Sequence, residues 1–353
     1  MKPLQILFLI SLAMGVACAS EPFPITYDSE AMFSKDKSIK RKTIYLNEDG
    51  TLAFKQCFEF ADAFHEGRAW IGSTDSDAKG YIDTHGKVVI DPQYHSLTKF
   101  SQGLAAVSIK DFKYFYIDAN GKKISDKIYN SADAFSHGLA AVKQTEKCSY
   151  LDKDETVVID EVAKSCYEFT DDAIARVKSA NNVWRFIDKK GSFVTQGYEE
   201  ANDFHEGLAV VQKERKWGVI NTKGDWVVPP SFQELDYKYK QGLLAAKKEG
   251  LWGFIDTKGH WVIEPSFEAT YGFGENGLSP VKKEGKWGYI NTKGEIAIPM
   301  QFETAWQFDK NGWANVKKEG KRIYIDGSGN EVQNKHYQLL KSSKECAEFL
   351  SKI

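Results

Sequence analysis

The sequence has no excess of charge of either sign. Its 353 residues include 47 lysines and arginines against 49 aspartates and glutamates, which gives a formal net charge of −2. A nucleic-acid-binding protein usually presents a broadly basic surface, and a protein held on an anionic membrane by charge needs clustered basic residues. The sequence therefore predicts no nucleic-acid partner and no electrostatic attachment to a membrane.

Long apolar runs are missing after the first twenty residues. No later segment reaches the roughly 18 apolar residues that a membrane-spanning helix needs, so no span is expected after signal removal. The start of the chain has the three parts of a secretory signal: Lys2, an apolar run over residues 4–16, and the cleavage pattern Ala17-Cys18-Ala19. We expect residues 1–19 to be removed and the protein to be exported, to the periplasm or outside the cell.

Cys18 leaves a second route of export open. A lipoprotein signal would be cut just before this cysteine, which would then be acylated and would anchor the protein on a membrane surface. Gly15 stands where such signals usually have leucine, so soluble export is the main expectation and a lipid anchor at Cys18 the alternative. Either route leads to an oxidising compartment, where disulfides persist.

Motifs of catalysis and metal binding are also missing. The sequence contains no Ser-His-Asp, Cys-His, Gly-x-Ser-x-Gly, His-Glu-x-x-His or phosphate-loop spacing, and its seven histidines are scattered. We therefore expect no enzymatic activity, no cofactor and no metal site. A hydrolase with a site at a loop edge is the third of three functional hypotheses.

What the sequence does contain is an internal repeat with a period of about 35 residues. One landmark is an aromatic residue followed by two residues and glycine, as in Phe64-His-Glu-Gly67 and Phe204-His-Glu-Gly207. A second is an Asp or Asn that stands three residues before a glycine in every copy except the one at Asp152. Its successive members are Asp83, Asp118, Asp152, Asp188, Asn221, Asp256, Asn291 and Asp326.

A third landmark is the pair Trp-Gly, which begins at Trp217, Trp252 and Trp287. With this pair the chain resembles the WG (or KWG) repeat family of bacterial proteins, from about residue 41 to residue 332. The resemblance implies a β-rich binding or scaffolding protein and no shared activity. It is weaker over residues 64–203, where other residues replace the Trp-Gly pair.

Residues 277–308 show why the unit should be a small antiparallel sheet. Glu284-Gly285 suits a two-residue hairpin turn, because such turns need positive φ angles. Asn291 to Gly294 suits a turn in which the Asn side chain accepts backbone hydrogen bonds. Pro299 is expected to end the third strand because it lacks a backbone donor. We therefore expect three strands, followed by a connection that leads to the next aromatic landmark.

One such unit cannot bury its aromatic faces alone, whereas stacked neighbours can. We expect an all-β repeat domain over residues 41–332, preceded by an irregular leader at 20–40 and followed by a capping helix at 333–353. An open solenoid or superhelix is favoured. A propeller-like closed ring is the alternative, since propeller blades usually have four strands and 40 or more residues.

Several side chains recur at fixed places in the repeat and are candidate site residues. Structural roles in the core and in the turns are expected for Trp217, Trp252, Trp287, Gly224, Gly259 and Gly294. Exposed positions that could bind a ligand are expected for Trp226, Trp261, Lys248, Lys283 and Lys318. The repeated Asp and Asn residues are expected to form turns rather than a calcium site, because each loop has a single such residue with a lysine often nearby.

Four cysteines remain after signal removal. Cys148 stands where other units have tryptophan, and a bond to Cys166 would compensate for the missing core side chain, so a Cys148–Cys166 disulfide is predicted. Cys57 and Cys346 can bond only if the two ends of the chain meet, as in a ring. The favoured function is an exported protein-binding or scaffolding module of the bacterial envelope. The alternative is a glycan or peptidoglycan binder.

Overall fold

The computed structural model describes residues 21–27, 42–47, 52–73, 76–109, 112–309 and 312–332. The predicted signal peptide, most of the leader and the predicted capping helix at 333–353 lie outside these residues. The described residues form strands β1 to β31 and contain no α-helix. No helix that could cross a membrane is found among them. The all-β prediction is thus confirmed.

The strands form nine separate antiparallel sheets, each built from strands that are consecutive in the sequence. The sheets of the N-terminal half are β1 (Phe23–Tyr27) and β2 (Lys42–Leu46); β3 (Phe60–Ala61), β4 (Arg68–Gly72), β5 (Lys79–Asp83) and β6 (Val88–Tyr94); β7 (Ser96–Leu97), β8 (Leu104–Ser108) and β9 (Tyr114–Asp118); β10 (Ser131–Ala132), β11 (Ala140–Lys143), β12 (Cys148–Leu151) and β13 (Val157–Ala163).

The five remaining sheets continue the same order. They are β14 (Ser165–Phe169), β15 (Ile174–Lys178) and β16 (Trp184–Asp188); β17 (Glu200–Ala201), β18 (Leu208–Lys213), β19 (Lys216–Asn221) and β20 (Trp226–Phe232); β21 (Glu234–Leu235), β22 (Leu244–Lys248), β23 (Leu251–Ile255) and β24 (Trp261–Phe267); β25 (Ala269–Thr270), β26 (Ser279–Lys283), β27 (Lys286–Ile290) and β28 (Ile296–Phe302); β29 (Thr304–Ala305), β30 (Ala314–Lys318) and β31 (Lys321–Ile325).

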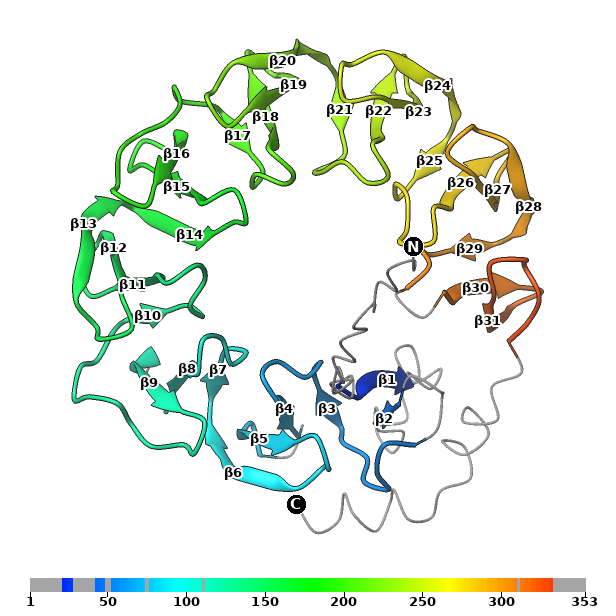
Figure 1. Cartoon of the computed structure of the whole chain (residues 1–353). Helices are drawn as coiled ribbons and strands as arrows, with labels where there is room; N and C mark the ends of the chain where they lie inside the picture. Colours follow the sequence, from blue (N-terminus) through cyan, green and yellow to red (C-terminus); the bar gives the residue numbers. More distant parts are fainter. Residues whose placement is uncertain are drawn as a thin grey trace, which may run out of the picture.

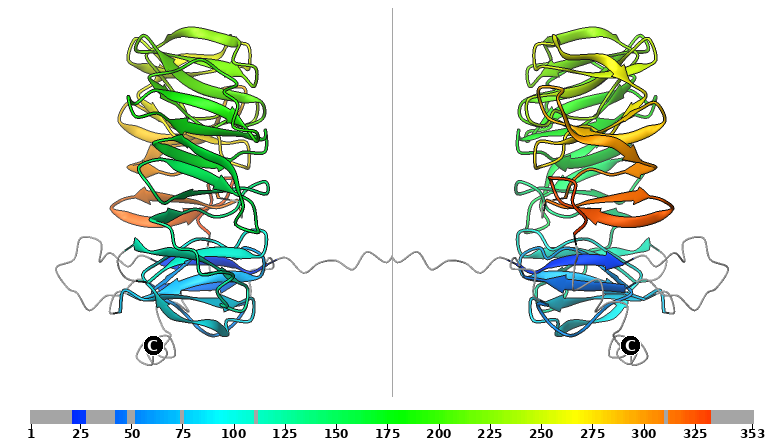
Figure 2. Two further views of the ribbon diagram at one scale, coloured as in Figure 1. Left: turned by 90° about the vertical axis from the view of Figure 1, so that its left-hand side faces the viewer. Right: turned by 90° about the vertical axis from the view of Figure 1, so that its right-hand side faces the viewer.

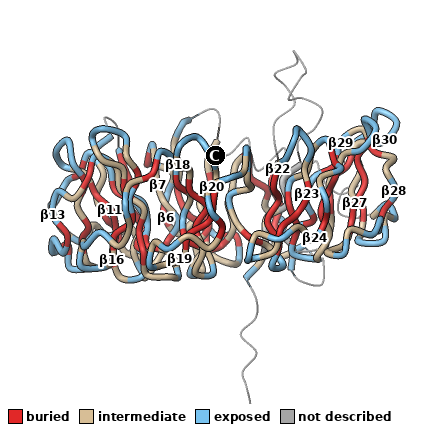
Figure 3. The backbone as a smooth tube through the Cα atoms, turned by 90° about the horizontal axis from the view of Figure 1, so that it is seen from above, coloured by how far each residue is buried: buried red, intermediate tan, exposed pale blue. Residues whose placement is uncertain are grey.

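The sheets follow one another around a circular course, and β29–β31 returns towards β1–β2 (Figure 1). Views at right angles show all the sheets in a single layer (Figure 2). Buried residues lie along the strands, whereas the loops at the edges of the layer are exposed (Figure 3). The circular course resembles the ring alternative.

The unit has more strands than expected. The segment read as a connection forms a two-residue first strand of the next sheet, as where Thr270 of β25 pairs with Val281 of β26. The expected strand end at proline is also wrong, because Pro265 and Pro299 lie inside β24 and β28. These strands are the outer edges of their sheets and bulge next to the proline, so the missing N–H has no ladder partner to lose.

The glycine of the Trp-Gly pair has a steric role in this bulge. A Cβ on Gly253 would lie 2.4 Å from the carbonyl oxygen of Ile263 on the outer strand. A Cβ on Gly218 would lie 2.6 Å from the carbonyl oxygen of Val228, and one on Gly288 would lie 2.6 Å from that of Ile298. The three-stranded sheets β7–β9, β14–β16 and β29–β31 lack this outer strand and have a larger residue in place of the glycine: Phe115, Arg185 and Ile323 respectively. A small residue here therefore permits the outer strand to pack against the sheet.

The two aromatic landmarks of the repeat meet between neighbouring sheets. In most units an aromatic residue of the third strand packs on the aromatic landmark of the next unit, as in Phe254–Phe273 and Tyr289–Phe308, each with ring centroids 4.8 Å apart. Such pairs contribute about 0.5–1.5 kcal/mol beyond the area they bury. Hydrophobic clusters that span two sheets follow, so the core is a series of contacts between neighbours.

Candidate binding cleft

The repeated Asp and Asn residues are used for turns. The Asp256 Oδ1 atom accepts backbone N–H bonds from Lys258 at 2.8 Å and His260 at 2.9 Å. All eight members of the series accept the same two bonds. No group of metal-ligating side chains is found among the described residues. The predicted turn role is therefore confirmed.

The loops between the first and second strands of the sheets point towards the middle of the circular course (Figure 1). Several of these loops end in a tight turn with two positive φ angles, as at Gln241 (54°) and Gly242 (72°). Three successive loops begin with an aromatic side chain, at Tyr237, Tyr271 and Trp306, and these are 56%, 44% and 52% exposed. The inner edge of the C-terminal half is thus unusually aromatic.

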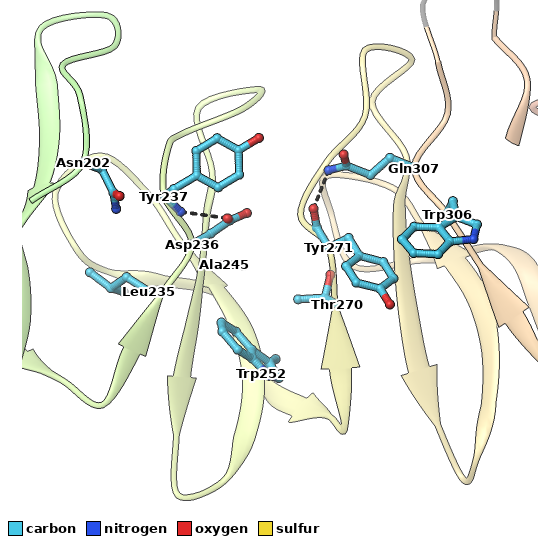
Figure 4. A pocket seen from close by; sticks show the side chains of 10 residues that line it. All are labelled: Asn202, Leu235, Asp236, Tyr237, Ala245, Trp252, Thr270, Tyr271, Trp306 and Gln307. Carbon is cyan, nitrogen blue, oxygen red and sulfur yellow. Dashed lines mark hydrogen bonds between the residues drawn. The ribbon is translucent and has the colours of Figure 1, made fainter. Parts of the chain in front are cut away.

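These side chains surround a cleft of about 640 Å³ between the β21–β24 and β25–β28 sheets. One wall comes from Asp236 and Tyr237, which follow β21, and from Trp252 in β23. The other comes from Thr270 and Tyr271 at the end of β25 (Figure 4). Trp306 and Gln307 of the next unit support this second wall. The volume falls within the roughly 300–1,000 Å³ that is typical of small-ligand sites.

The second wall of the cleft is a stack of three parallel rings. The Tyr271 ring lies 5.1 Å from Trp287 with an interplanar angle of 2°, and 5.2 Å from Trp306 with an angle of 13°. The Gln307 side-chain amide donates to the backbone oxygens of Tyr271 and Phe273, which ties the loop to its neighbour. The exposed rings are therefore held in place before any ligand binds.

Polar groups lie beside the aromatic ones. The Asp236 Oδ1 atom accepts the Tyr237 backbone N–H at 2.7 Å. Burial raises the pKa of the Asp236 carboxyl, and the Tyr237 N–H and the Lys238 charge partly oppose this shift. The Asn202 side chain also lines the cleft and makes no side-chain hydrogen bond to another described residue. The cleft thus offers hydrogen-bonding groups as well as ring faces.

Two lysines occupy ring faces on the first wall. The Lys238 Nζ atom lies 5.2 Å from the Tyr237 ring centroid, and the Lys247 Nζ atom lies 5.5 Å from the Trp252 centroid. Lys247 is also paired with Glu234 at 2.8 Å. The cation sites on these two rings are therefore already used by the protein's own side chains.

A second cleft occupies the equivalent place between the β10–β13 and β14–β16 sheets, with a volume of about 360 Å³. Here a disulfide joins Cys148 and Cys166, whose Cα atoms are 6.0 Å apart. Cys148 stands where the first cleft has Trp252, and Cys166 stands where it has Thr270. The bond links two neighbouring sheets covalently, and it is the pairing that the sequence indicated.

Of the tryptophans named from the sequence, Trp252 lines the cleft, and the others contribute to packing between the sheets. Trp287 is buried, and Trp217 and Trp252 are half-buried against the core between sheets. Trp226 and Trp261, which were expected to be exposed, are also half-buried. Trp226 packs edge-on against Tyr198, with ring centroids 5.9 Å apart, and Trp261 packs edge-on against Phe232 at 5.8 Å. Both rings lie against core clusters, so they contribute to packing.

The lysine and glycine positions lie in the turns. Lys248, Lys283 and Lys318 are exposed at the hairpins between the second and third strands. Gly224, Gly259 and Gly294 have φ angles of 83° to 84°, as the turns require. The cleft residues Tyr237, Tyr271 and Trp306 were missed. Their only signal in the sequence is an aromatic residue two places before the aromatic landmark in three successive units.

The fold and the cleft together define an all-β repeat protein with a preformed site between repeats. Comparison with known families identifies which repeat it is. The family described as WG containing repeat matches residues 80–111, 114–148, 184–217, 217–252, 252–287 and 287–321. The chain therefore belongs to the WG repeat family, as the resemblance indicated. No curated protein matches it.

Solved structures resemble the chain at low identity. A eukaryotic initiation factor is 10% identical, with 73% of this chain and 82% of that chain covered and a TM-score of 0.49. BamB from Moraxella catarrhalis is 11% identical, with coverage of 78% and 94% and a TM-score of 0.40. Hsv2 from Kluyveromyces lactis is 12% identical, with coverage of 65% and 92% and a TM-score of 0.37.

Proposed function

We propose that the protein is an exported, non-catalytic binding protein of the bacterial envelope or the extracellular space, and that it holds its ligand in the aromatic cleft between the β21–β24 and β25–β28 sheets. The observation that carries this proposal is the convergence of Tyr237, Tyr271 and Trp306 on one cleft of about 640 Å³. Exposed aromatic residues clustered in a concave, preformed site are typical of ligand recognition.

The surrounding structure supports binding because it is rigid where the ligand would lie. The stacked rings and the Gln307 bonds hold the wall in one arrangement, so little conformational entropy remains to be lost on binding. A scaffolding role with a protein partner would use the same inner edge, since neighbouring loops present one continuous surface.

Export is supported by the signal pattern at residues 1–19 and by the Cys148–Cys166 bond, because disulfides persist mainly outside the cytoplasm. A lipid anchor at Cys18 is the alternative route. N-terminal sequencing of the mature protein distinguishes them. We expect a free Ser20, and a blocked, acylated Cys18 would establish the anchored form.

We further propose that the ring of sheets is closed by a second disulfide. Cys57 is disulfide-bonded, and Cys148 and Cys166 are bonded to each other. Of the five cysteines, Cys18 and Cys346 remain, both outside the described residues. Cys18 belongs to the signal segment, so we expect Cys57 to pair with Cys346. Non-reducing peptide mapping tests this pairing, and a peptide that links Cys57 to any other cysteine would refute it.

The test of the binding proposal is co-sedimentation of the mature protein with a washed cell-envelope fraction of its host. We expect Trp306→Ala to weaken retention about tenfold, since it removes an aromatic wall of the cleft. Phe193→Ala is the matched control, because Phe193 is 50% exposed and lies outside the cleft. Equal retention of the two variants, or no retention of the wild type, would refute the proposal.

A further inference from the structure

We infer that the ligand of this cleft is an uncharged carbohydrate chain built of flat, equatorially substituted pyranose rings. The inference rests on the proposed function and adds the chemical class of the ligand. Three properties of the cleft carry it: its ring faces, its polar edge and the charges already present on its walls.

The ring faces supply the apolar part of the recognition. Pyranose rings whose hydroxyl groups are all equatorial present a flat patch of C–H bonds on each side, and such patches pack against aromatic faces. Tyr271 is the middle ring of the stack, so the free ring face of this wall belongs to Trp306, which is held by stacking on Tyr271 and is 52% exposed. Tyr237 is more exposed and stands across the cleft (Figure 4). A flat sugar can therefore lie between the two walls.

The polar edge supplies the hydroxyl recognition. The Asp236 carboxylate accepts hydrogen bonds, and the Asn202 amide can both donate and accept. A purely apolar group, such as a proline or leucine side chain of a partner protein, would bury these groups without partners. Burying an unpaired polar group costs free energy, so an apolar ligand fits this cleft less well than a polyhydroxylated one.

On the first wall, the charges already present disfavour a cationic ligand, because Lys238 and Lys247 lie 5.2 and 5.5 Å from the Tyr237 and Trp252 ring centroids. An anionic ligand would approach the half-buried Asp236 carboxylate, whose charge would repel it. An uncharged ligand avoids both conflicts.

The equivalent cleft in the N-terminal half lacks these properties. Cys148, which is bonded to Cys166, stands where the C-terminal cleft has Trp252. The Arg176 guanidinium lies over one face of Tyr167, with its Cζ atom 4.4 Å from the ring centroid. Arg176 also lies 4.6 Å from the Trp184 ring. Two places before the aromatic landmark, the N-terminal cleft also has Asp133 where the C-terminal cleft has Tyr237, so it lacks two facing aromatic walls and the inference applies to the C-terminal cleft alone.

The test is isothermal titration calorimetry of the full mature protein with cellotetraose and with tetra-N-acetylchitotetraose, beside choline chloride and a proline-rich decapeptide. We expect at least one tetrasaccharide to bind and neither of the other two probes to do so. Tyr237→Ala should weaken the tetrasaccharide about tenfold. Because Tyr237 makes no ring contact with another described aromatic residue, this variant should keep the melting temperature of the wild type.

Asp236→Ala should also weaken the tetrasaccharide about tenfold, through the loss of hydrogen bonds to a charged acceptor, and Phe193→Ala should bind as the wild type does. Retention of the wild type on the envelope fraction without binding of either tetrasaccharide would overturn the carbohydrate inference and leave the proposed function standing. Binding of choline or the peptide in the cleft would overturn it as well. If the envelope fraction does not retain the wild type at all, both the proposed function and the carbohydrate inference are refuted.

Discussion

The two equivalent clefts of the repeat domain share one backbone arrangement but differ in what joins the neighbouring sheets. Two equivalent positions face each other across each cleft. In the C-terminal cleft these positions hold Trp252 and Thr270, and the space between the sheets is open and aromatic. In the N-terminal cleft they hold Cys148 and Cys166, and a covalent bond joins the sheets. A repeat that gives up a large core side chain can thus regain stability by a disulfide, whereas a repeat that keeps the tryptophan retains an open aromatic cleft.

The largest expected effect is the loss of the covalent link. Cys148→Ser removes a bond that closes a loop of 18 residues, and chain-entropy arguments give about 3 kcal/mol for such a loop. Urea unfolding of the wild type and the variant under oxidising conditions measures the difference. A loss below about 1 kcal/mol would show that neighbouring contacts already hold these sheets together.

A second comparison concerns two glycines, Gly253 beside Trp252 and Gly327 in the last sheet's turn. Gly253 follows Trp252, and a Cβ there would lie 2.4 Å from the Ile263 carbonyl oxygen. We expect Gly253→Ala to lower the free energy of unfolding by about 2 kcal/mol, as for other overpacked sites. Gly327 is the control, because the only atom near its Cβ would be Asn276 Nδ2 at 3.8 Å. Equal melting temperatures for the two variants would contradict the steric role of the Trp-Gly pair.

Transfer of the disulfide would convert one cleft into the other. We expect the double variant Trp252→Cys and Thr270→Cys to form a bond between the sheets, since these positions match Cys148 and Cys166. The bond should offset most of the stability lost with the indole, which leaves a net change of about 1 kcal/mol. Retention on the envelope fraction should disappear. A variant that forms the bond and still binds would place the ligand elsewhere.

The smallest expected effect concerns a carboxyl group of the N-terminal cleft. Desolvation, aided by the Glu168 charge, raises the pKa of Asp133 to about 6. The folded protein therefore holds this proton where the unfolded chain has lost it, so the contribution of Asp133 to stability falls as pH rises from about 4 through 6. Carboxyl NMR titration should show this pKa, and Glu168→Gln should lower it. An Asp133 pKa near 4 in the wild type would contradict the prediction.

Much of the unit could be predicted from the sequence because its signals are local. The hairpin turn at Glu284-Gly285 and the turn at Asn291 to Gly294 depend on residues within four positions of each other, and both occur as expected. The Cys148–Cys166 pair was indicated by the replacement of a single repeated tryptophan.

Features that depend on neighbouring units could not be predicted in this way. In seven of the nine described sheets the first strand has two residues, as in β21 and β25, which is too short for any periodicity. The circular course depends on a small rotation between sheets that no single residue encodes. Trp226 and Trp261 were misplaced because their position beside a turn indicated exposure, whereas the contact that covers them comes from the fold.

The most direct test of the central claim is the set of tryptophan indole resonances in a proton–nitrogen NMR spectrum during titration with cellotetraose or tetra-N-acetylchitotetraose. The nine tryptophans of the chain give separate probes of the cleft and of the core. Binding in the cleft predicts that the Trp252 and Trp306 signals shift with the ligand while those of Trp226 and Trp261 stay in place. Shifts at Trp226 and Trp261 with none at Trp306 would contradict the account.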